Sequence, residues 1–168
     1  MVDLKLKEDM TNIWNYINKI CDSSKKWEEN IVSQIGYALR IAKEYYTKED
    51  YDHALRVAGY VAENLMIPED KMDTCIALAI MHDLLEDSSY DYSGEGKLTI
   101  YFINCLDFLT KKKDDSYTEY IDKIRKNSKE YPEAYWVKLA DMKDHLTQKE
   151  TLTDKLRDKY LTALPELL

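Results

Sequence analysis

Apolar residues recur at three- and four-residue steps along almost the whole chain, which is the pattern of amphipathic helices. Only four glycines and three prolines punctuate the 168 residues, so the helices should be joined by short loops. One stretch, LTIYFINCLDFLT, also suits a strand because Ile100, Tyr101 and Phe102 favour sheets, and we interpret it as a helix. The pattern predicts an all-α fold.

Three amphipathic segments make up the N-terminal part. The first has apolar positions at Leu6, Met10, Ile13, Trp14, Ile17 and Ile20, and a polar break at Asp22 to Lys26 separates it from a second with Ile31, Ile35, Ala38 and Ile41. The third begins near Glu49, turns Ala54, Val57, Ala58, Val61 and Leu65 inward and ends at Ile67-Pro68. His53 lies one turn before Val57, on the same inward face.

A fourth helix is predicted from about Glu69 to Glu86 and contains the run CIALAIMHDLL. It is apolar nearly all round, as expected for the central helix of a bundle. Two ionisable residues, His82 and Asp83, interrupt the apolar run. Burying them without partners is costly, so a hydrogen-bonding partner or a metal ion is needed there.

The C-terminal part is predicted to alternate loops and helices. Ser88 to Gly96 and the run KKKDDS have loop composition, YTEYIDKIRK suits a helix, and Pro132 opens another helix, EAYWVKLADMKDHL. A last amphipathic helix runs through Leu156, Tyr160, Leu161 and Leu164. The length suits one domain over residues 1–168.

Charge and cysteine usage narrow the class of partner. The formal net charge is −8 and no predicted helix carries a basic stripe, which argues against duplex nucleic acid and favours a small substrate. Cys21, Cys75 and Cys105 lack metal-site spacing, and the charged N-terminus does not suit a signal peptide, so a cytoplasmic location is expected. No apolar run reaches the roughly 18 residues of a membrane span.

His82-Asp83, together with His53 and Asp141, suggests a metal site. Alone, His53 would be an ordinary core histidine and Asp141 an ordinary helix aspartate, but their placement on inward faces beside His82-Asp83 favours a shared site. Two imidazoles and two carboxylates suit a six-coordinate manganese, iron, cobalt or nickel ion, with zinc a further candidate. Glu86 and Asp87 follow one turn later and are placed to handle protons.

The order of these motifs resembles a known family. His53, HDLLED at 82–87 and VKLAD at 137–141 are similar to the H…HD…D pattern of the HD superfamily, in the variant of the RelA/SpoT-type alarmone hydrolases and their small single-domain relatives. The resemblance spans about residues 35–165 and implies a single-domain HD-type helical bundle. Residues 1–30 lie before it, and their apolar pattern predicts an N-terminal packing helix. The resemblance also implies one metal ion, usually Mn²⁺, bound by His53, His82, Asp83 and Asp141, with Glu86 and Asp87 activating water.

Two departures concern substrate recognition. His145 stands where the family usually has asparagine, and the segment KEYYTKEDYDH lacks the basic stretch that contacts guanine. Lys43, Lys48 or Arg56 are candidates to replace that stretch. Lys112, Lys138 and His145 are candidate substrate contacts, although each is equally consistent with an ordinary surface or helix-end residue. Tyr117 and Tyr120 either stack on a base or pack in the core.

The family resemblance implies an enzyme that hydrolyses a phosphate ester of a nucleotide, and ppGpp 3′-pyrophosphohydrolase is the best single guess. The alternatives are a nucleoside-monophosphate phosphatase of the same superfamily and a non-catalytic nucleotide-binding module. A metal-free helical interaction protein is a third class, which predicts no stabilisation by metal ions. The sequence does not specify the oligomeric state.

Overall fold

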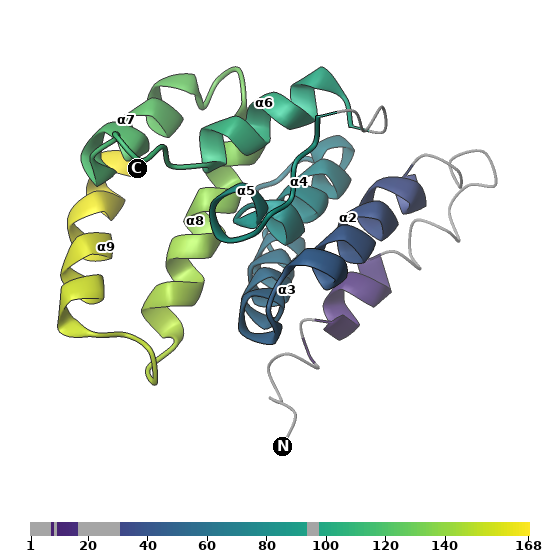
Figure 1. Cartoon of the computed structure of the whole chain (residues 1–168), viewed down its shortest axis with the longest axis horizontal. Helices are drawn as coiled ribbons and strands as arrows, with labels where there is room; N and C mark the ends of the chain where they lie inside the picture. Colours follow the sequence, from purple (N-terminus) through teal and green to yellow (C-terminus); the bar gives the residue numbers. More distant parts are fainter. Residues whose placement is uncertain (1–7, 9, 17–30, 94–97) are drawn as a thin grey trace.

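The structure, a computed structural model, describes residues 8, 10–16, 31–93 and 98–168. Within these ranges the chain forms helices and no strand, as predicted (Figure 1). Residues 10–16 are helical, and the further helices are α2 (Ile31–Tyr45), α3 (Lys48–Ala62), α4 (Glu69–Met81), α5 (Leu84–Asp87), α6 (Ile100–Leu109), α7 (Tyr117–Asn127), α8 (Pro132–Thr147) and α9 (Asp154–Leu167). The stretch with strand-forming residues is therefore the helix α6.

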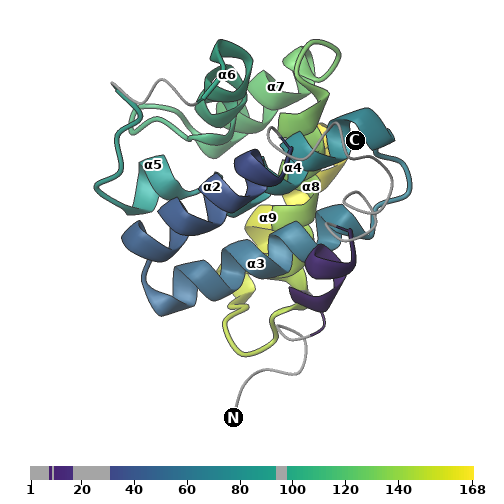
Figure 2. The same ribbon diagram turned by 90° about the vertical axis from the view of Figure 1, so that its right-hand side faces the viewer.

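Helix α4 lies at the centre of the main hydrophobic core. Every residue from Cys75 to Met81 is buried, and α4 packs against α2, α3, α6 and α8 (Figures 1 and 2). Such all-round burial explains why this helix is apolar on every face. The inward positions predicted for α3, Ala54, Val57, Ala58 and Val61, are buried as well.

A second, smaller hydrophobic cluster lies at the other side of α8. It joins α7, α8 and α9 through Tyr120, Ile121, Ile124, Met142, Tyr160, Ala163 and Leu167. Helix α8 also contributes Ala134, Val137 and Ala140 to the main core. Helix α8 therefore separates two apolar regions, and it carries four buried polar residues, Glu133, Lys138, Asp141 and Asp144.

Some predicted inward positions are exposed. Leu65 is 98% exposed because α3 ends at Ala62, before the predicted stop, and the chain then turns toward Pro68. In α9, Leu161 is 51% exposed whereas its neighbour Tyr160 is buried. Leu6, Ile17, Ile20, Cys21, the break at 22–26 and residues 94–97 of the predicted loop lie outside the described residues.

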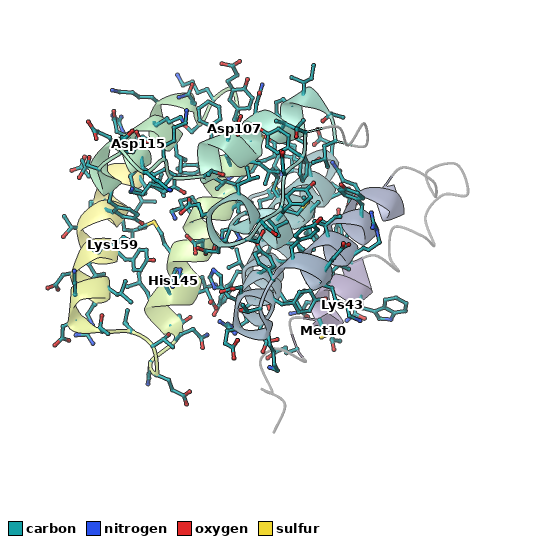
Figure 3. All side chains as sticks on the ribbon, in the orientation of Figure 1. Met10, Lys43, Asp107, Asp115, His145 and Lys159 are labelled. Atoms are coloured by element: carbon teal, nitrogen blue, oxygen red, sulfur yellow. The ribbon has the colours of Figure 1, made fainter. Side chains whose placement is uncertain are left out.

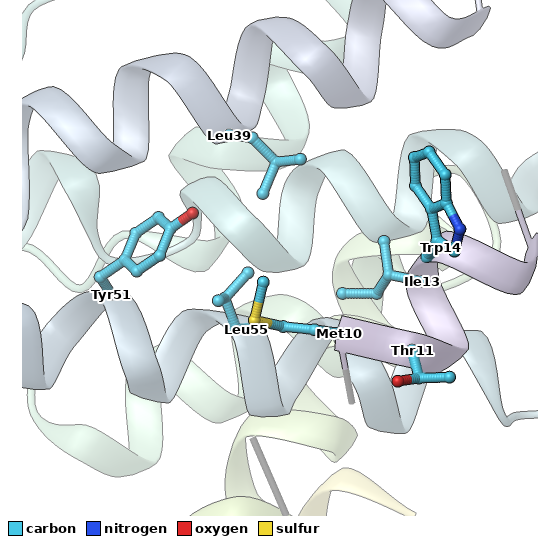
Figure 4. Close-up of a pocket in the computed structure, with 7 residues that line it drawn as sticks. All are labelled: Met10, Thr11, Ile13, Trp14, Leu39, Tyr51 and Leu55. Atoms are coloured by element: carbon cyan, nitrogen blue, oxygen red, sulfur yellow. The ribbon is translucent and has the colours of Figure 1, made fainter. Parts of the chain in front are cut away.

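The helical segment at residues 10–16 covers the main core only in part. Ile13 is buried, but Met10 and Trp14 are largely exposed. These side chains and Thr11 line an apolar pocket of about 380 Å³ with Leu39 of α2 and with Tyr51 and Leu55 of α3 (Figure 4).

Across the described ranges, none of the helices has the length and hydrophobicity that crossing a lipid bilayer requires.

Candidate metal centre

The predicted helix from Glu69 to Glu86 is interrupted at His82-Asp83. Helix α4 ends at Met81, Asp83 has φ −99° and ψ 0°, and the short helix α5 starts at Leu84. Two hydrogen bonds take the place of the helical one at this point. His82 Nδ1 is 2.8 Å from the carbonyl oxygen of Ala79, the group to which Asp83 N–H would donate in a continuous helix. Asp83 N–H instead donates to the hydroxyl of Tyr46, at 3.1 Å.

The break brings His82 and Asp83 to one place with residues from α3 and α8. His53 Nε2 lies 3.3 Å from Asp141 Oδ1 and 3.6 Å from Asp83 Oδ2. His82 Nε2 lies 3.7 Å from Asp141 Oδ1 and 3.1 Å from Asp83 Oδ2. All four side chains that the sequence analysis proposed as ligands thus lie together, and the potential ligand atoms of His53, His82 and Asp141 are within 4.8 Å of one another.

Three buried atoms of this cluster make no well-aligned hydrogen bond, although oppositely charged side chains lie beside them. Five such side-chain atoms occur among the described residues, and His53 Nε2, His82 Nε2 and Asp141 Oδ1 are three of them. Buried polar atoms are normally satisfied, and here the unsatisfied ones face a common point. Nitrogen and oxygen atoms arranged in this way fit a divalent metal ion.

The outer nitrogen of each imidazole is oriented by an acceptor. His82 Nδ1 has the Ala79 carbonyl, and His53 Nδ1 lies 2.8 Å from Asp144 Oδ2. When Nδ1 carries the proton, the Nε2 lone pair of each ring is free to bind a cation. The hydrogen bonds at the two Nδ1 atoms are therefore also those expected of histidines that bind a metal ion through Nε2.

Charge in the cluster shifts the pKa values of its members. Burial lowers the pKa of His53, but the carboxylates of Asp141 and Asp144 outweigh it and raise the pKa to about 8. Burial also lowers the pKa of His82, and the charges of Asp83 and Asp141 raise it well above the ordinary value. Burial raises the pKa of Asp141, but the Lys138 ammonium and the histidines hold it well below its usual range. The carboxylates therefore stay ionised and stabilise positive charge on the neighbouring imidazoles.

Lys138 and His145, two candidate substrate contacts, lie directly beside the cluster. Lys138 is buried, its Nζ is 2.6 Å from Asp141 Oδ2, and it lies 4.9 Å from the centre of the Tyr120 ring. In the protein without substrate, Lys138 therefore pairs with a carboxylate of the cluster. His145 Nε2 is 3.1 Å from Asp141 Oδ1, and its ring stacks on that of Tyr160, with centroids 4.9 Å apart.

Helix α9 places one further cation near these residues. Lys159 Nζ lies 4.1 Å from the centre of the Tyr117 ring and 4.9 Å from that of Tyr160. Figure 3 shows His145 on α8 and Lys159 on the neighbouring helix α9. Tyr120 is buried in the second hydrophobic cluster, so its ring packs in the core when no ligand is bound.

Glu86 and Asp87 are exposed residues of α5, the short helix that begins directly after Asp83. Glu86 Oε1 accepts a hydrogen bond from the backbone N–H of Lys111. Partial burial raises the pKa of both carboxyl groups. Lys112 is exposed, and no hydrogen bond or ion pair within the described ranges connects its side chain to the cluster.

Sequence reasoning did not include Asp144 and Tyr46 in the site and assigned Arg56 elsewhere. Arg56 was a candidate base contact, but its guanidinium binds Asp144, with Nε 2.9 Å from Oδ1. Asp144 follows Asp141 by three residues, so it falls on the same face of α8. That spacing was the available signal. Lys48, another candidate, pairs with Asp52 at 2.5 Å.

A scan against protein-family models found no match to this chain, and a search of curated proteins found none either.

Proposed function

We propose that this protein is a metal-dependent phosphohydrolase that acts on a nucleotide. The observation that carries the proposal is the convergence of three unpartnered buried ligand atoms, from α3, α8 and the turn after α4, on one point. Asp83 adds a second carboxylate on the more exposed side, where its side chain is 27% accessible. The similarity of the motif order to the HD superfamily adds support for hydrolysis of a phosphate ester.

His53, His82, Asp83 and Asp141 would hold the ion, with Mn²⁺ the first candidate and Fe, Co, Ni or Zn the others. A bound divalent ion supplies Lewis acidity toward a phosphoryl oxygen and lowers the pKa of water. Glu86 is the first choice of proton acceptor and Asp87 the second, because both are exposed, follow Asp83 within about one turn and have raised pKa values. Lys138 neutralises part of the charge of Asp141, which lowers the repulsion toward an anionic substrate.

The proposed substrate is a nucleotide with a pyrophosphate ester, and ppGpp is the best single guess. The resemblance of HDLLED and VKLAD to the motifs of alarmone hydrolases supports this choice. A nucleoside monophosphate is the alternative within the same superfamily. The two substrates give different products, because the first releases pyrophosphate and the second releases orthophosphate.

The test is product analysis of Mn²⁺-loaded protein incubated with ppGpp, pppGpp, nucleoside monophosphates and nucleoside triphosphates. We expect pyrophosphate release from ppGpp, and its loss in Asp83→Ala. Asp70→Asn is the matched control, because Asp70 is an exposed aspartate at the other end of α4 and should leave the product unchanged.

Each other outcome has a defined meaning. Orthophosphate release from monophosphates would replace the pyrophosphohydrolase with a monophosphatase. Nucleotide binding without turnover, unchanged by Glu86→Gln, would indicate a binding module. Failure to bind any divalent metal would contradict the proposed function itself and favour a metal-free interaction protein.

A further inference from the structure

We infer that Asp144, held in place by Arg56, is the positioning residue for the proposed metal ligand His53. Asp144 lies on α8 and is 1% exposed, whereas His53 and Arg56 both lie on α3. The inference rests on the proposed metal site, and it assigns to two residues outside the ligand set the task of fixing the geometry of one ligand.

The contacts of Asp144 leave its carboxylate little freedom. Arg56 Nε donates to Oδ1 at 2.9 Å and its terminal nitrogen donates to Oδ2 at 3.1 Å, which is a bidentate arrangement. Gln148 Nε2 adds a contact to Oδ1 at 3.3 Å. Paired, parallel bonds from a planar guanidinium fix both the position and the plane of a carboxylate. Asp144 therefore presents Oδ2 to His53 in one orientation.

His53 needs such an acceptor because the two nitrogens of its ring have different functions in the proposed site. Nδ1 carries the proton, and Nε2 binds the ion. Its Nδ1 is 2.8 Å from Asp144 Oδ2, while its Nε2 faces Asp141 and Asp83 without a hydrogen-bond partner. A proton held on Nδ1 by Asp144 leaves the Nε2 lone pair directed into the cluster. Rotation of the ring would break the bond to Asp144.

The Arg56–Asp144 pair performs this task without changing the net charge near the site. The negative charge of Asp144 is matched by the positive charge of Arg56, and the two side chains are 1% and 14% exposed. The negative charge available to a cation therefore comes from Asp83 and from Asp141, whose charge Lys138 offsets in part. Asp144 therefore positions His53, whereas Asp83 and Asp141 would neutralise the charge of the bound ion.

Two measurements on the full chain test the inference. The first is the His53 Nδ1–H proton in ¹H–¹⁵N spectra of metal-free protein, which is tractable because the sequence has only three histidines. We expect a slowly exchanging Nδ1–H signal in the wild type and in Asp144→Asn, which keeps an acceptor oxygen, and its loss in Asp144→Ala. The second is Mn²⁺ affinity, followed by the electron paramagnetic resonance of free Mn²⁺. We expect a 10- to 100-fold weakening in Asp144→Ala and a smaller one in Asp144→Asn.

The matched control is Glu133→Gln. Glu133 is a buried carboxylate of the same helix and binds Lys71 Nζ at 2.7 Å, but no contact joins it to a histidine among the described residues. We expect this variant to lose thermal stability and to keep both the Nδ1–H signal and the wild-type Mn²⁺ affinity. Asp144→Asn guards against loss of folding in Asp144→Ala, because the amide has nearly the shape of the carboxylate.

Failure of the inference is distinguishable from failure of the proposed function. Wild-type Mn²⁺ affinity in both Asp144 variants would overturn the positioning role while leaving the metal site intact. If wild-type protein binds no metal, the proposed function fails, and the Nδ1–H signal decides whether Asp144 orients His53. An unprotected Nδ1–H in the wild type would overturn the inference.

Discussion

The pair Lys138 and Asp141 is the point at which stability and the proposed chemistry depend on the same atoms. Both side chains are buried, and their charged groups are 2.6 Å apart. Removing one member of a buried ion pair leaves the other charge without compensation. The two members differ, however, because Asp141 also faces His53, His82 and His145, whereas Lys138 has Asp141 as its close carboxylate partner.

We therefore expect unequal effects from the two substitutions. Asp141→Asn should lower the free energy of unfolding by about 3–5 kcal/mol, because it leaves the Lys138 ammonium buried without an anion. Lys138→Met should cost less, because methionine fills similar space and Asp141 keeps the histidines. Urea denaturation of metal-free protein measures both, with Lys126→Met in an exposed pair as the control. An equal loss in the two variants would contradict this account.

Glu86 gives a prediction about pH. Partial burial holds the pKa of its carboxyl above the ordinary value, and a proton acceptor must be deprotonated. Activity should consequently be full above this raised pKa and fall as the pH decreases through it. Glu86→Gln should lower kcat by about 10²- to 10⁴-fold and abolish this dependence. A pH profile of kcat/KM tests this, and an unchanged acidic limb in Glu86→Gln would assign the titration to another group. The exposed Glu44 supplies the control, Glu44→Gln.

Residue by residue, the sequence predicted the cluster better than its surroundings. His53, His82, Asp83 and Asp141 come together as expected, because an inward helical face can be identified from spacing alone. The partner of Asp144 could not be identified in that way. Its bond to Arg56 depends on how far α3 and α8 are shifted along each other, and no local pattern records that shift.

Among the elements, the break between α4 and α5 most affects the site. It replaces one helical hydrogen bond with a bond from Asp83 N–H to a tyrosine hydroxyl on a distant segment. Asp83 then adopts dihedral angles near the bridge region, where active-site residues are often found. Sequence periodicity did not predict the break, because Leu84 and Leu85 continue the apolar pattern and the competing bond comes from the tertiary structure.

Tyr46→Phe isolates the contribution of that hydroxyl. It leaves the N–H of Asp83 without its acceptor, and we expect a loss of about 1–3 kcal/mol in the free energy of unfolding. Faster hydrogen exchange at the Asp83 amide should accompany the loss. Tyr92→Phe is the comparison, because the Tyr92 hydroxyl contacts the exposed Asp107 side chain and its removal should cost less than about 0.5 kcal/mol. If the Asp83 amide exchanges at the wild-type rate in Tyr46→Phe, another contact causes the break.

At the scale of the molecule, the proposed ligands tie together helices that are far apart in the sequence. His53 lies on α3, His82 after α4 and Asp141 on α8, and these three helices pack against one another. An ion bound there would stabilise the folded state, because the unfolded chain has no equivalent site. Stability should therefore depend on metal concentration.

We expect Mn²⁺ at about 100 times its dissociation constant to add about 2.7 kcal/mol to the free energy of unfolding. Chelation should reverse the gain, and Asp141→Asn should show none of it. Thermal melts with and without Mn²⁺ measure the effect. A gain that persists in Asp141→Asn would place the ion elsewhere.

The whole-molecule prediction from sequence was correct in class and incomplete in arrangement. Helical periodicity was enough to predict an all-α fold and to place most helices, because it depends on local burial. It did not predict that α7 and α9 form a second cluster with one side of α8, because both cores need the same apolar residue types. Leu65, predicted to be buried and in fact exposed, shows the same limit.

The order of the ligands along the chain has a consequence for biosynthesis. The ribosome releases His53 and His82 before Asp141 and the α7–α9 cluster have been made. A nascent chain therefore exposes two histidines that lack the carboxylate of α8, and the proposed ion-binding geometry can form only after α8 has been synthesised. If the proposed site binds an ion, loading would follow the synthesis of α8, and the metal ions available at that moment would influence which one the protein receives.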